Sequence, residues 1–116
     1  MSAKLLIVDD DRTTREGLKQ LLANAGYRTI TAGTFPEAAH ALRSDSPDLL
    51  IVDVRLGEYN GLQLIITAER RIPAIVLTGY ADPVVEDEAR HEGAEYLVKP
   101  VDTQALLGLI RKLLPS

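Results

Sequence analysis

Six side chains suited to polar chemistry stand directly after short apolar runs or close them. They are Asp9, Asp10 and Asp11 after residues 5–8, Asp53 after residues 49–52, Thr78 after residues 74–77 and Lys99 after residues 96–98. The carboxyl ends of parallel strands meet at one edge of a sheet, and ligands bind at that edge. We therefore expect carboxylates, a hydroxyl and an ammonium to converge on a single site.

These residue types together suit phosphoryl transfer assisted by a metal ion. Clustered carboxylates raise one another's pKa and are stable together chiefly around a hard cation, and oxygen-only ligands favour Mg²⁺. A carboxylate oxygen is a competent nucleophile toward phosphorus, while Thr78 and Lys99 supply a hydroxyl and an ammonium for the phosphoryl oxygens. A glycine-rich phosphate loop is absent, and the row of acids would repel the phosphate of a nucleotide or a flavin.

An alternation of strands and helices must position these side chains. Apolar runs at residues 5–8, 29–31, 49–52, 74–77 and 96–98 predict five buried strands. Five helical patterns lie between and after them. The first covers residues 18–25 and ends at Gly26, and the second starts with a capping box from Thr34 to Glu37 and continues to Leu42. The other three cover residues 62–66, the stretch from Asp82 to Gly93, and residues 103–114. The chain is therefore predicted to form one α/β domain over residues 1–116, a flavodoxin-like (βα)₅ fold. Its doubly wound, five-stranded parallel sheet has order 2-1-3-4-5 in three layers, α/β/α.

Composition narrows the classes of function. The chain of 116 residues has a formal net charge of −4 and no block of Lys and Arg, which argues against direct nucleic-acid binding. The absence of cysteine excludes thiolate nucleophiles and Cys-ligated zinc, and fits a reducing compartment. The apolar run at residues 5–8 is too short for a signal peptide or a membrane span. We expect a soluble, cytoplasmic domain.

Five separated motifs in this order resemble the receiver domain of two-component response regulators, over essentially the whole chain. They are Asp9-Asp10, Asp53 with Gly61 eight positions later, Thr78-Gly79, Tyr96, and Lys99-Pro100. The resemblance implies a signalling phosphoacceptor rather than an enzyme, with Asp53 accepting the phosphoryl group. It also implies Asp10 and Asp53 as direct Mg²⁺ ligands, with Mn²⁺ as a substitute, Asp9 as a ligand through water and Arg55 as a ligand through its backbone carbonyl. Thr78 and Lys99 would bind phosphoryl oxygens, Tyr96 would be the switch aromatic and the bond before Pro100 would be cis.

Three departures from the family pattern stand out. Val54-Arg55-Leu56-Gly57 replaces the usual Met-Pro after the phosphoacceptor, so this loop is expected to be looser. The stretch from Asp53 to Thr78 is short, which predicts a trimmed third helix or return loop. The segment before Tyr96 is also one residue short. Among the remaining polar residues, Asp11 is read as a helix N-cap, and His40 and His91 as surface residues.

Two rival functions use the same residues differently. Asp9-Asp10-Asp11-Arg12-Thr13 matches the D-x-D-x-T nucleophile motif of haloacid-dehalogenase-like phosphatases, with Asp9 as the nucleophile. That family needs further metal-binding acids after the lysine, where only Asp102 follows, and it leaves Asp53 unexplained. A flavodoxin-type electron carrier would need a phosphate loop and ring-stacking aromatics.

The resemblance also implies partners. A sensor histidine kinase or phosphotransfer domain would supply the phosphoryl group, and an output domain outside this sequence or a separate target protein would receive the signal. The apolar excess of residues 106–114 predicts a docking surface, with phosphorylation-dependent homodimerisation as the expected readout. Bulky Arg55 and Tyr80, two positions after Asp53 and Thr78, are expected to lengthen the life of the phosphoryl group by hindering water.

Overall fold

The computed structural model describes residues 3–114 and contains one five-stranded parallel sheet. Its strands are β1 (Lys4–Val8), β2 (Arg28–Ala32), β3 (Leu49–Asp53), β6 (Ala74–Thr78) and β7 (Glu95–Val98). Their order across the sheet is β2-β1-β3-β6-β7, and every neighbouring pair is parallel. Counted over these five strands, this is the predicted order 2-1-3-4-5, so the flavodoxin-like fold is confirmed.

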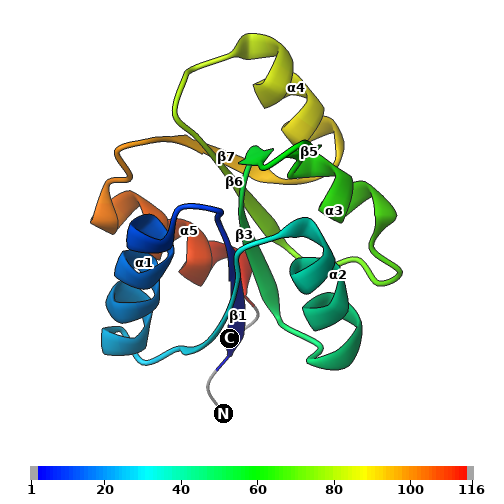
Figure 1. Cartoon of the computed structure of the whole chain (residues 1–116). Helices are drawn as coiled ribbons and strands as arrows, with labels where there is room; N and C mark the ends of the chain where they lie inside the picture. The colour runs from blue at the N-terminus through cyan, green and yellow to red at the C-terminus, as the bar shows by residue number, and fades with distance from the viewer. Residues whose placement is uncertain (1–2, 115–116) are drawn as a thin grey trace.

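Five helices cover the two faces of this sheet. They are α1 (Arg12–Asn24), α2 (Phe35–Ser44), α3 (Leu62–Thr67), α4 (Pro83–His91) and α5 (Thr103–Leu113). Figure 1 shows α1 and α5 on one side of the sheet and α2, α3 and α4 on the other, which makes the predicted three layers. None of the helices between residues 3 and 114 is long and apolar enough to cross a membrane.

The sheet divides the core into two apolar clusters, because successive side chains of a strand point to opposite faces. In β1, Leu6 and Val8 pack with α2, α3 and α4, whereas Leu5 and Ile7 pack with α1 and α5. The surplus leucines of α5 contribute to the second cluster. Leu107, Leu109, Leu113 and Leu114 are half-buried against it.

The prediction of a docking surface on α5 therefore has to be corrected, because these leucines complete the core. On the same region of the molecule, the large apolar side chains that are exposed belong to neighbouring elements. Val84 of α4 is 64% exposed and Val98 of β7 is 39% exposed. A partner that used apolar contacts here would meet these valines first.

Four of the helices that the structure describes begin at a capping side chain, and the sequence indicated three of these caps, Asp11, Thr34 and Asp82. Thr34 accepts a hydrogen bond from the Glu37 amide, and Asp11, Asp82 and Asp102 cap the helices that follow them. The Glu37 carboxylate accepts from the Gly33 amide, one residue before the amide that an ordinary capping box would use. The start of α2 is thereby tied to the end of β2.

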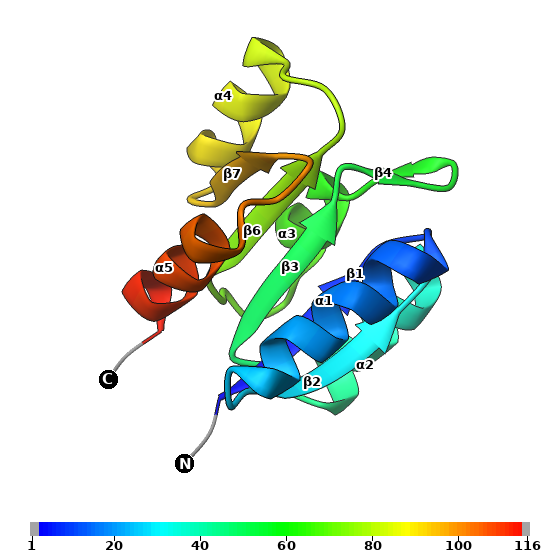
Figure 2. The same ribbon diagram turned by 90° about the vertical axis from the view of Figure 1, so that its left-hand side faces the viewer.

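A small hairpin between β3 and α3 was not predicted. It consists of the two-residue strands β4 (Arg55–Leu56) and β5 (Tyr59–Asn60), which pair antiparallel. Figure 2 shows it extending beyond the carboxyl end of β3. The following helix α3 has only six residues, in agreement with the predicted trimming, and residues 68–73 return to β6 without further regular structure.

Candidate functional site

An ammonium bridges two carboxylates at the carboxyl edge of the sheet. The Lys99 Nζ lies 2.9 Å from Asp9 Oδ2 and 2.6 Å from Asp53 Oδ2. Asp9 follows β1, Asp53 ends β3 and Lys99 follows β7, so three separate strands deliver the three groups. The Lys99–Pro100 peptide bond is cis, as the resemblance implies. The structure thus brings together three of the side chains that the sequence placed at one edge.

Burial and hydrogen bonding set the charge of this trio. Burial raises the pKa of the Asp9 carboxyl; hydrogen bonds from the Asp11 amide and from Lys99 oppose this rise without cancelling it. For Lys99, burial alone would lower the pKa, but hydrogen bonds to Asp53 and Asp9 outweigh burial and raise it. The lysine therefore stays charged at neutral pH and serves as the counter-ion of both acids.

Asp53 is held by its own loop as well as by Lys99. The Asp53 Oδ1 accepts a hydrogen bond of 2.8 Å from the Arg55 amide, and Asp53 is only 8% exposed. Gly61 closes the loop against it: a Cβ at Gly61 would overlap the Asp53 carbonyl oxygen and stand 2.8 Å from Val52 Cγ2. The conspicuous glycine eight positions after Asp53 is thus required by close backbone approach.

The two acids after Asp9 behave differently from it. Asp10 is exposed, and its Oδ2 accepts a hydrogen bond of 3.2 Å from the Gly57 amide of the hairpin. Asp11 is the N-cap of α1 and accepts from the amide and the hydroxyl of Thr14, which lower the pKa of the Asp11 carboxyl. The reading of Asp11 as a cap is confirmed.

The donor set suits a hard divalent cation, although its carboxylates are not gathered as a cluster. Between residues 3 and 114, no three His, Cys, Asp or Glu side chains stand together at a spacing that would hold a metal ion. Lys99 supplies the positive charge instead, and no buried side-chain nitrogen or oxygen in that range lacks a hydrogen-bond partner. Asp9, Asp10 and Asp53 are nevertheless three carboxylates at one strand edge, the chemistry that Mg²⁺ prefers.

Thr78 and Tyr96 meet at the loop that follows β6. The Thr78 hydroxyl donates to the Tyr80 carbonyl at 3.0 Å, so it is directed into its own loop. The Tyr96 hydroxyl accepts from the Asp82 amide at 3.0 Å and lies 3.4 Å from the same Tyr80 carbonyl. The hydroxyl groups of both side chains therefore contact one backbone oxygen, which couples the end of β6 to β7.

Arg55 and Tyr80 contact each other beside the site. The Arg55 guanidinium carbon lies 5.5 Å from the centre of the Tyr80 ring, in cation–π geometry. Tyr80 is 71% exposed, so this contact lies at the surface. It joins the hairpin to the loop after β6.

Several contributing residues escaped sequence reasoning. Arg15 of α1 donates to the Asp9 carbonyl at 2.8 Å and lies against Gly33, where a Cβ would stand 2.6 Å from its Nη1. Tyr59 of the hairpin stacks on Phe35 at a centroid distance of 4.6 Å. Gly33, at the end of a strand, was the only sequence signal for the contacts of Arg15. The stacking of Tyr59 on Phe35 could not be predicted, because it depends on the unpredicted hairpin.

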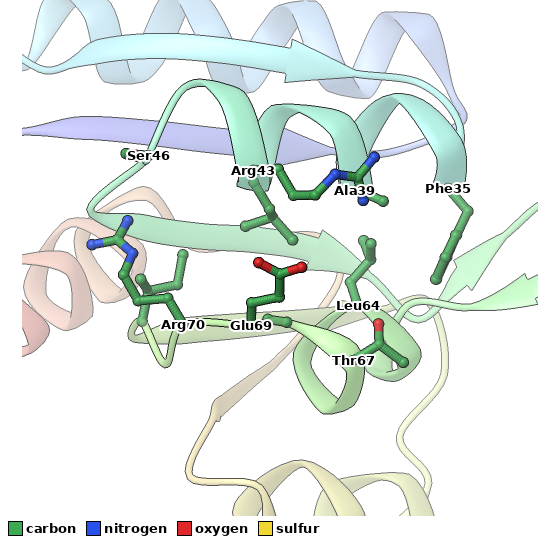
Figure 3. Close-up of a pocket in the computed structure, with 11 residues that line it drawn as sticks. Phe35, Ala39, Arg43, Ser46, Leu64, Thr67, Glu69 and Arg70 are labelled. Carbon is green, nitrogen blue, oxygen red and sulfur yellow. The ribbon is translucent and has the colours of Figure 1, made fainter.

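A groove between α2 and α3 is separate from this site. Figure 3 shows Phe35, Arg43, Leu64 and Glu69 among its lining residues. It contains none of the aspartates, nor Thr78 or Lys99. The chemical groups predicted from the sequence therefore converge elsewhere, at the carboxyl edge of the strands.

Comparison with known proteins finds relatives that match nearly the whole chain. The family described as "Response regulator receiver domain" matches residues 5–111. Response regulator MprA of Mycobacterium tuberculosis is 38% identical over 120 residues, covering 98% of this chain and 51% of the relative. The DNA-binding transcriptional regulator NtrC of Escherichia coli is 34% identical over 110 residues, covering 91% of this chain and 24% of the relative. The chain thus spans about half of one relative and about a quarter of the other.

Solved structures show the same fold. A CheY-like receiver domain protein from Methanospirillum hungatei superposes with a TM-score of 0.90 at 29% identity, covering 97% of this chain and 93% of that one. The chemotaxis response regulator CheY4 of Vibrio cholerae superposes with a TM-score of 0.88 at 28% identity, covering 98% and 100%.

Proposed function

Because the chain belongs to the response-regulator receiver domain family, we propose that Asp53 accepts a phosphoryl group from a phosphohistidine of a sensor kinase or phosphotransfer domain. One observation carries the proposal: the Lys99 ammonium reaches the Asp53 carboxylate from the carboxyl end of β7, two strands away in the sheet. A nucleophile and a cation able to bind its incoming phosphoryl oxygens are thereby already in contact.

The transfer assigns a task to each side chain. A carboxylate oxygen of Asp53 forms the new P–O bond while the P–N bond to the donor imidazole breaks, and the electron pair leaves with the imidazole nitrogen. Lys99 then moves its hydrogen bonds from the carboxylate to a phosphoryl oxygen. The Thr78 hydroxyl turns from the Tyr80 carbonyl to another phosphoryl oxygen, and the Arg55 amide keeps the acceptor loop oriented.

Asp9, Asp10, Asp53 and the Arg55 carbonyl would hold Mg²⁺, for which Mn²⁺ is a chemically similar substitute. When bound, the ion neutralises charge on the phosphoryl oxygens. Without it, Lys99 alone faces Asp9 and Asp53. The Asp10 Oδ2 accepts a hydrogen bond from the Gly57 amide, so the hairpin of β4 and β5 borders the carboxylates that would hold the ion.

The geometry speaks against the phosphatase alternative. Asp9 is 1% exposed and Asp53 is 8% exposed, so a substrate reaches the Asp9 carboxylate less easily. Asp11, the second acid of the D-x-D motif, is occupied as the cap of α1. Asp53 is the better candidate because it is the more exposed of the two acids that contact Lys99 and the family resemblance points to it.

The signal would leave through α4, β7 and α5, toward an output domain or a separate protein. The relatives named MprA and NtrC are about two and four times longer than this chain, which leaves room in those proteins for further domains. A hollow between α1 and the segment after Lys99, bordered by Gly17 and Leu21, offers the phosphodonor a place to dock beside the site.

Acetyl phosphate with Mg²⁺ tests the assignment. Mass spectrometry of the labelled protein should place the added phosphoryl group on Asp53, and Asp53→Asn should lose it. Beryllofluoride with Mg²⁺ should raise the melting temperature of the parent but not of Asp53→Asn, because a ligand that binds only the folded state stabilises it. Labelling at Asp9 would establish the phosphatase reading, and labelling at neither would remove both.

The lifetime of the phosphoryl group gives a second test. Hydrolysis needs water in line with the Asp53–phosphorus bond. Arg55 and Tyr80 follow Asp53 and Thr78 by two positions and contact each other, so we expect their side chains to hinder this approach. We expect the double variant Arg55→Asn/Tyr80→Ala to lose the group faster than the parent, by about twofold to fivefold, the size of an exposed cation–π contact. The decay is followed with Mg²⁺ present. Equal decay rates would show that these side chains do not guard the site.

A further inference from the structure

The segment between Asp53 and α3 forms only a very short hairpin, yet it contacts Asp53, Asp10 and Tyr80. We call residues 54–61 the site hairpin. Its ladder comprises two pairs of residues, Arg55 with Asn60 and Leu56 with Tyr59. A two-stranded ribbon of this size is not stable alone in water. Its position must therefore be fixed by contacts with the rest of the molecule.

Two contacts of the site hairpin anchor it and two others act on the site. Leu56 is 1% exposed in the first core cluster, and Tyr59 stacks on Phe35 at the start of α2, with 24° between the ring planes. The Gly57 amide reaches the Asp10 carboxylate, and the Arg55 guanidinium reaches the Tyr80 ring. The anchors lie on the side of α2, which contributes no side chain to the site.

The base of the hairpin is held by its backbone, since the Gly61 amide donates to the Val54 carbonyl at 2.7 Å. Next to the turn, Leu56 anchors the first strand, and Tyr59 is the side chain that anchors the second. Tyr59 is 52% exposed, too exposed to serve as an ordinary core residue. Phe35 also lines the groove between α2 and α3 and is seen at its end in Figure 3. Because Leu56 and Tyr59 face each other directly beside the turn that carries Gly57, loss of the stack would loosen this turn and weaken the pairing of the two strands.

We propose that Phe35 and Tyr59 are a positioning pair that holds the site hairpin over Asp53 and thereby sets how fast water reaches the phosphorylated residue. The proposal rests on the proposed function, since it concerns the lifetime of phosphorylated Asp53. The pair touches no reacting atom. It acts through Arg55, which it keeps against Tyr80, and through the Gly57 amide, which it keeps near Asp10.

Decay of the acetyl phosphate label, with Mg²⁺ present, measures the effect on lifetime. Tyr59→Ala should shorten the lifetime about threefold to tenfold, the factor that corresponds to an aromatic pair. Tyr59→Phe keeps the stack and should decay like the parent. Ile66→Ala is the matched control, because Ile66 is 53% exposed and lies on α3, where it lines a groove with α4; its lifetime should not change.

A double-variant comparison separates positioning from general loosening of the fold. If Tyr59 acts partly through Arg55, Tyr59→Ala should change the decay less once Arg55 is already Asn, because only the route through the Gly57 amide is left. If Tyr59 only stabilised the fold, its effect would be equally large in both backgrounds. That equal effect would overturn the proposal, as would an unchanged lifetime in Tyr59→Ala.

Hydrogen exchange of the unphosphorylated protein provides a readout independent of phosphorylation. The Gly57 amide should exchange faster in Tyr59→Ala than in the parent, Tyr59→Phe or Ile66→Ala, while amides of β1 and β3 stay protected. Unchanged exchange at Gly57 would overturn the positioning role. If the parent takes no label at Asp53 while the Gly57 amide still exchanges faster in Tyr59→Ala, only the proposed function is contradicted.

Discussion

At the scale of single residues, the shared ammonium of Lys99 is the main electrostatic feature of the molecule. Asp9 is nearly inaccessible and Asp53 is 8% exposed, whereas the Lys99 side chain keeps 24% of its surface in contact with solvent. Loss of one partner from such a group leaves buried charge uncompensated, which costs more than the intact pair contributes. The cost is moderated here because water reaches the lysine.

We expect Lys99→Met to lower the free energy of unfolding by about 1–3 kcal/mol at pH 7 without divalent cations. Because the folded-state pKa of Lys99 is raised above the ordinary 10.5, its stabilising effect is complete below that pH and is lost as the pH rises through the raised value. Urea denaturation of both proteins in EDTA from pH 7 to 11.5 measures the difference. A difference that stays constant up to pH 11.5 would mean that the ion pairs do not form in solution.

The sequence predicted which side chains lie at the site when they follow a strand directly, but it did not predict which way those side chains point. Asp9, Asp53 and Lys99 follow apolar runs, and parallel pairing brought them together as expected. The sequence could not tell that Asp10 would turn toward the Gly57 amide, since this depends on a hairpin tip 47 residues away. Nor could it tell that the Thr78 hydroxyl would bond within its own loop.

At the scale of elements, the turn after Asp53 depends on one steric requirement. Gly61 has a φ of −57°, which any residue can adopt, so its backbone conformation does not require glycine. The requirement comes from the Asp53 carbonyl oxygen and the Val52 side chain, which occupy the space where a Cβ would be. A backbone oxygen cannot move aside as a flexible side chain can.

Gly61→Ala should therefore destabilise the protein by about 2–4 kcal/mol, within the range of severe overpacking. Gly17→Ala is the matched control: Gly17 lies in α1, and no atom stands within 4 Å of the place that a Cβ would take there. That change should stabilise by about 0.5–1 kcal/mol through the helix preference for alanine. Thermal or urea unfolding measures the change in the free energy of unfolding for both variants. Equal changes would contradict the steric explanation.

The five sheet strands and five helices were predictable because their patterns are local. Apolar runs fixed the strands, and caps at Thr34 and Asp82 fixed helix starts. The two-residue strands β4 and β5 carry no periodicity to detect, because a pattern needs several residues. The leucines of α5 were misread for a related reason: periodicity indicates an apolar face but not how wide the neighbouring sheet is.

At the scale of the whole molecule, the loop after β6 connects the site to the face formed by α4, β7 and α5. The Tyr80 carbonyl contacts the hydroxyls of both Thr78 and Tyr96. If Thr78 turns toward a phosphoryl group, that carbonyl loses one partner and the loop can shift against Tyr96. Val84 and Val98, exposed on the same face, would then be presented differently to a partner.

Beryllofluoride with Mg²⁺ should shift the amide resonances of α4 and β7 in the parent protein. Tyr96→Ala should weaken these shifts while those around Asp53 remain, because the variant binds the mimic but lacks the coupling side chain. Tyr96→Phe keeps the ring and removes the hydroxyl, so it shows which of the two is needed for the shifts. We also expect sedimentation velocity to show dimer formation with the mimic. Identical shifts in Tyr96→Ala and the parent would exclude Tyr96 from the switch.

The short helix α3 starts beside Asp53 and leads away from it, and the plain return segment at residues 68–73 enters β6 at the end of the sheet opposite Asp53 and Thr78. The Leu50 amide bonds the Pro73 carbonyl at 2.9 Å, which fixes the register of β6 just downstream of this segment. Insertions or deletions over an evolutionary lineage can therefore accumulate here without moving the reactive edge. A chain that has shed part of this helix can keep its chemistry, and the same segment is the natural place to graft a peptide tag or a reporter.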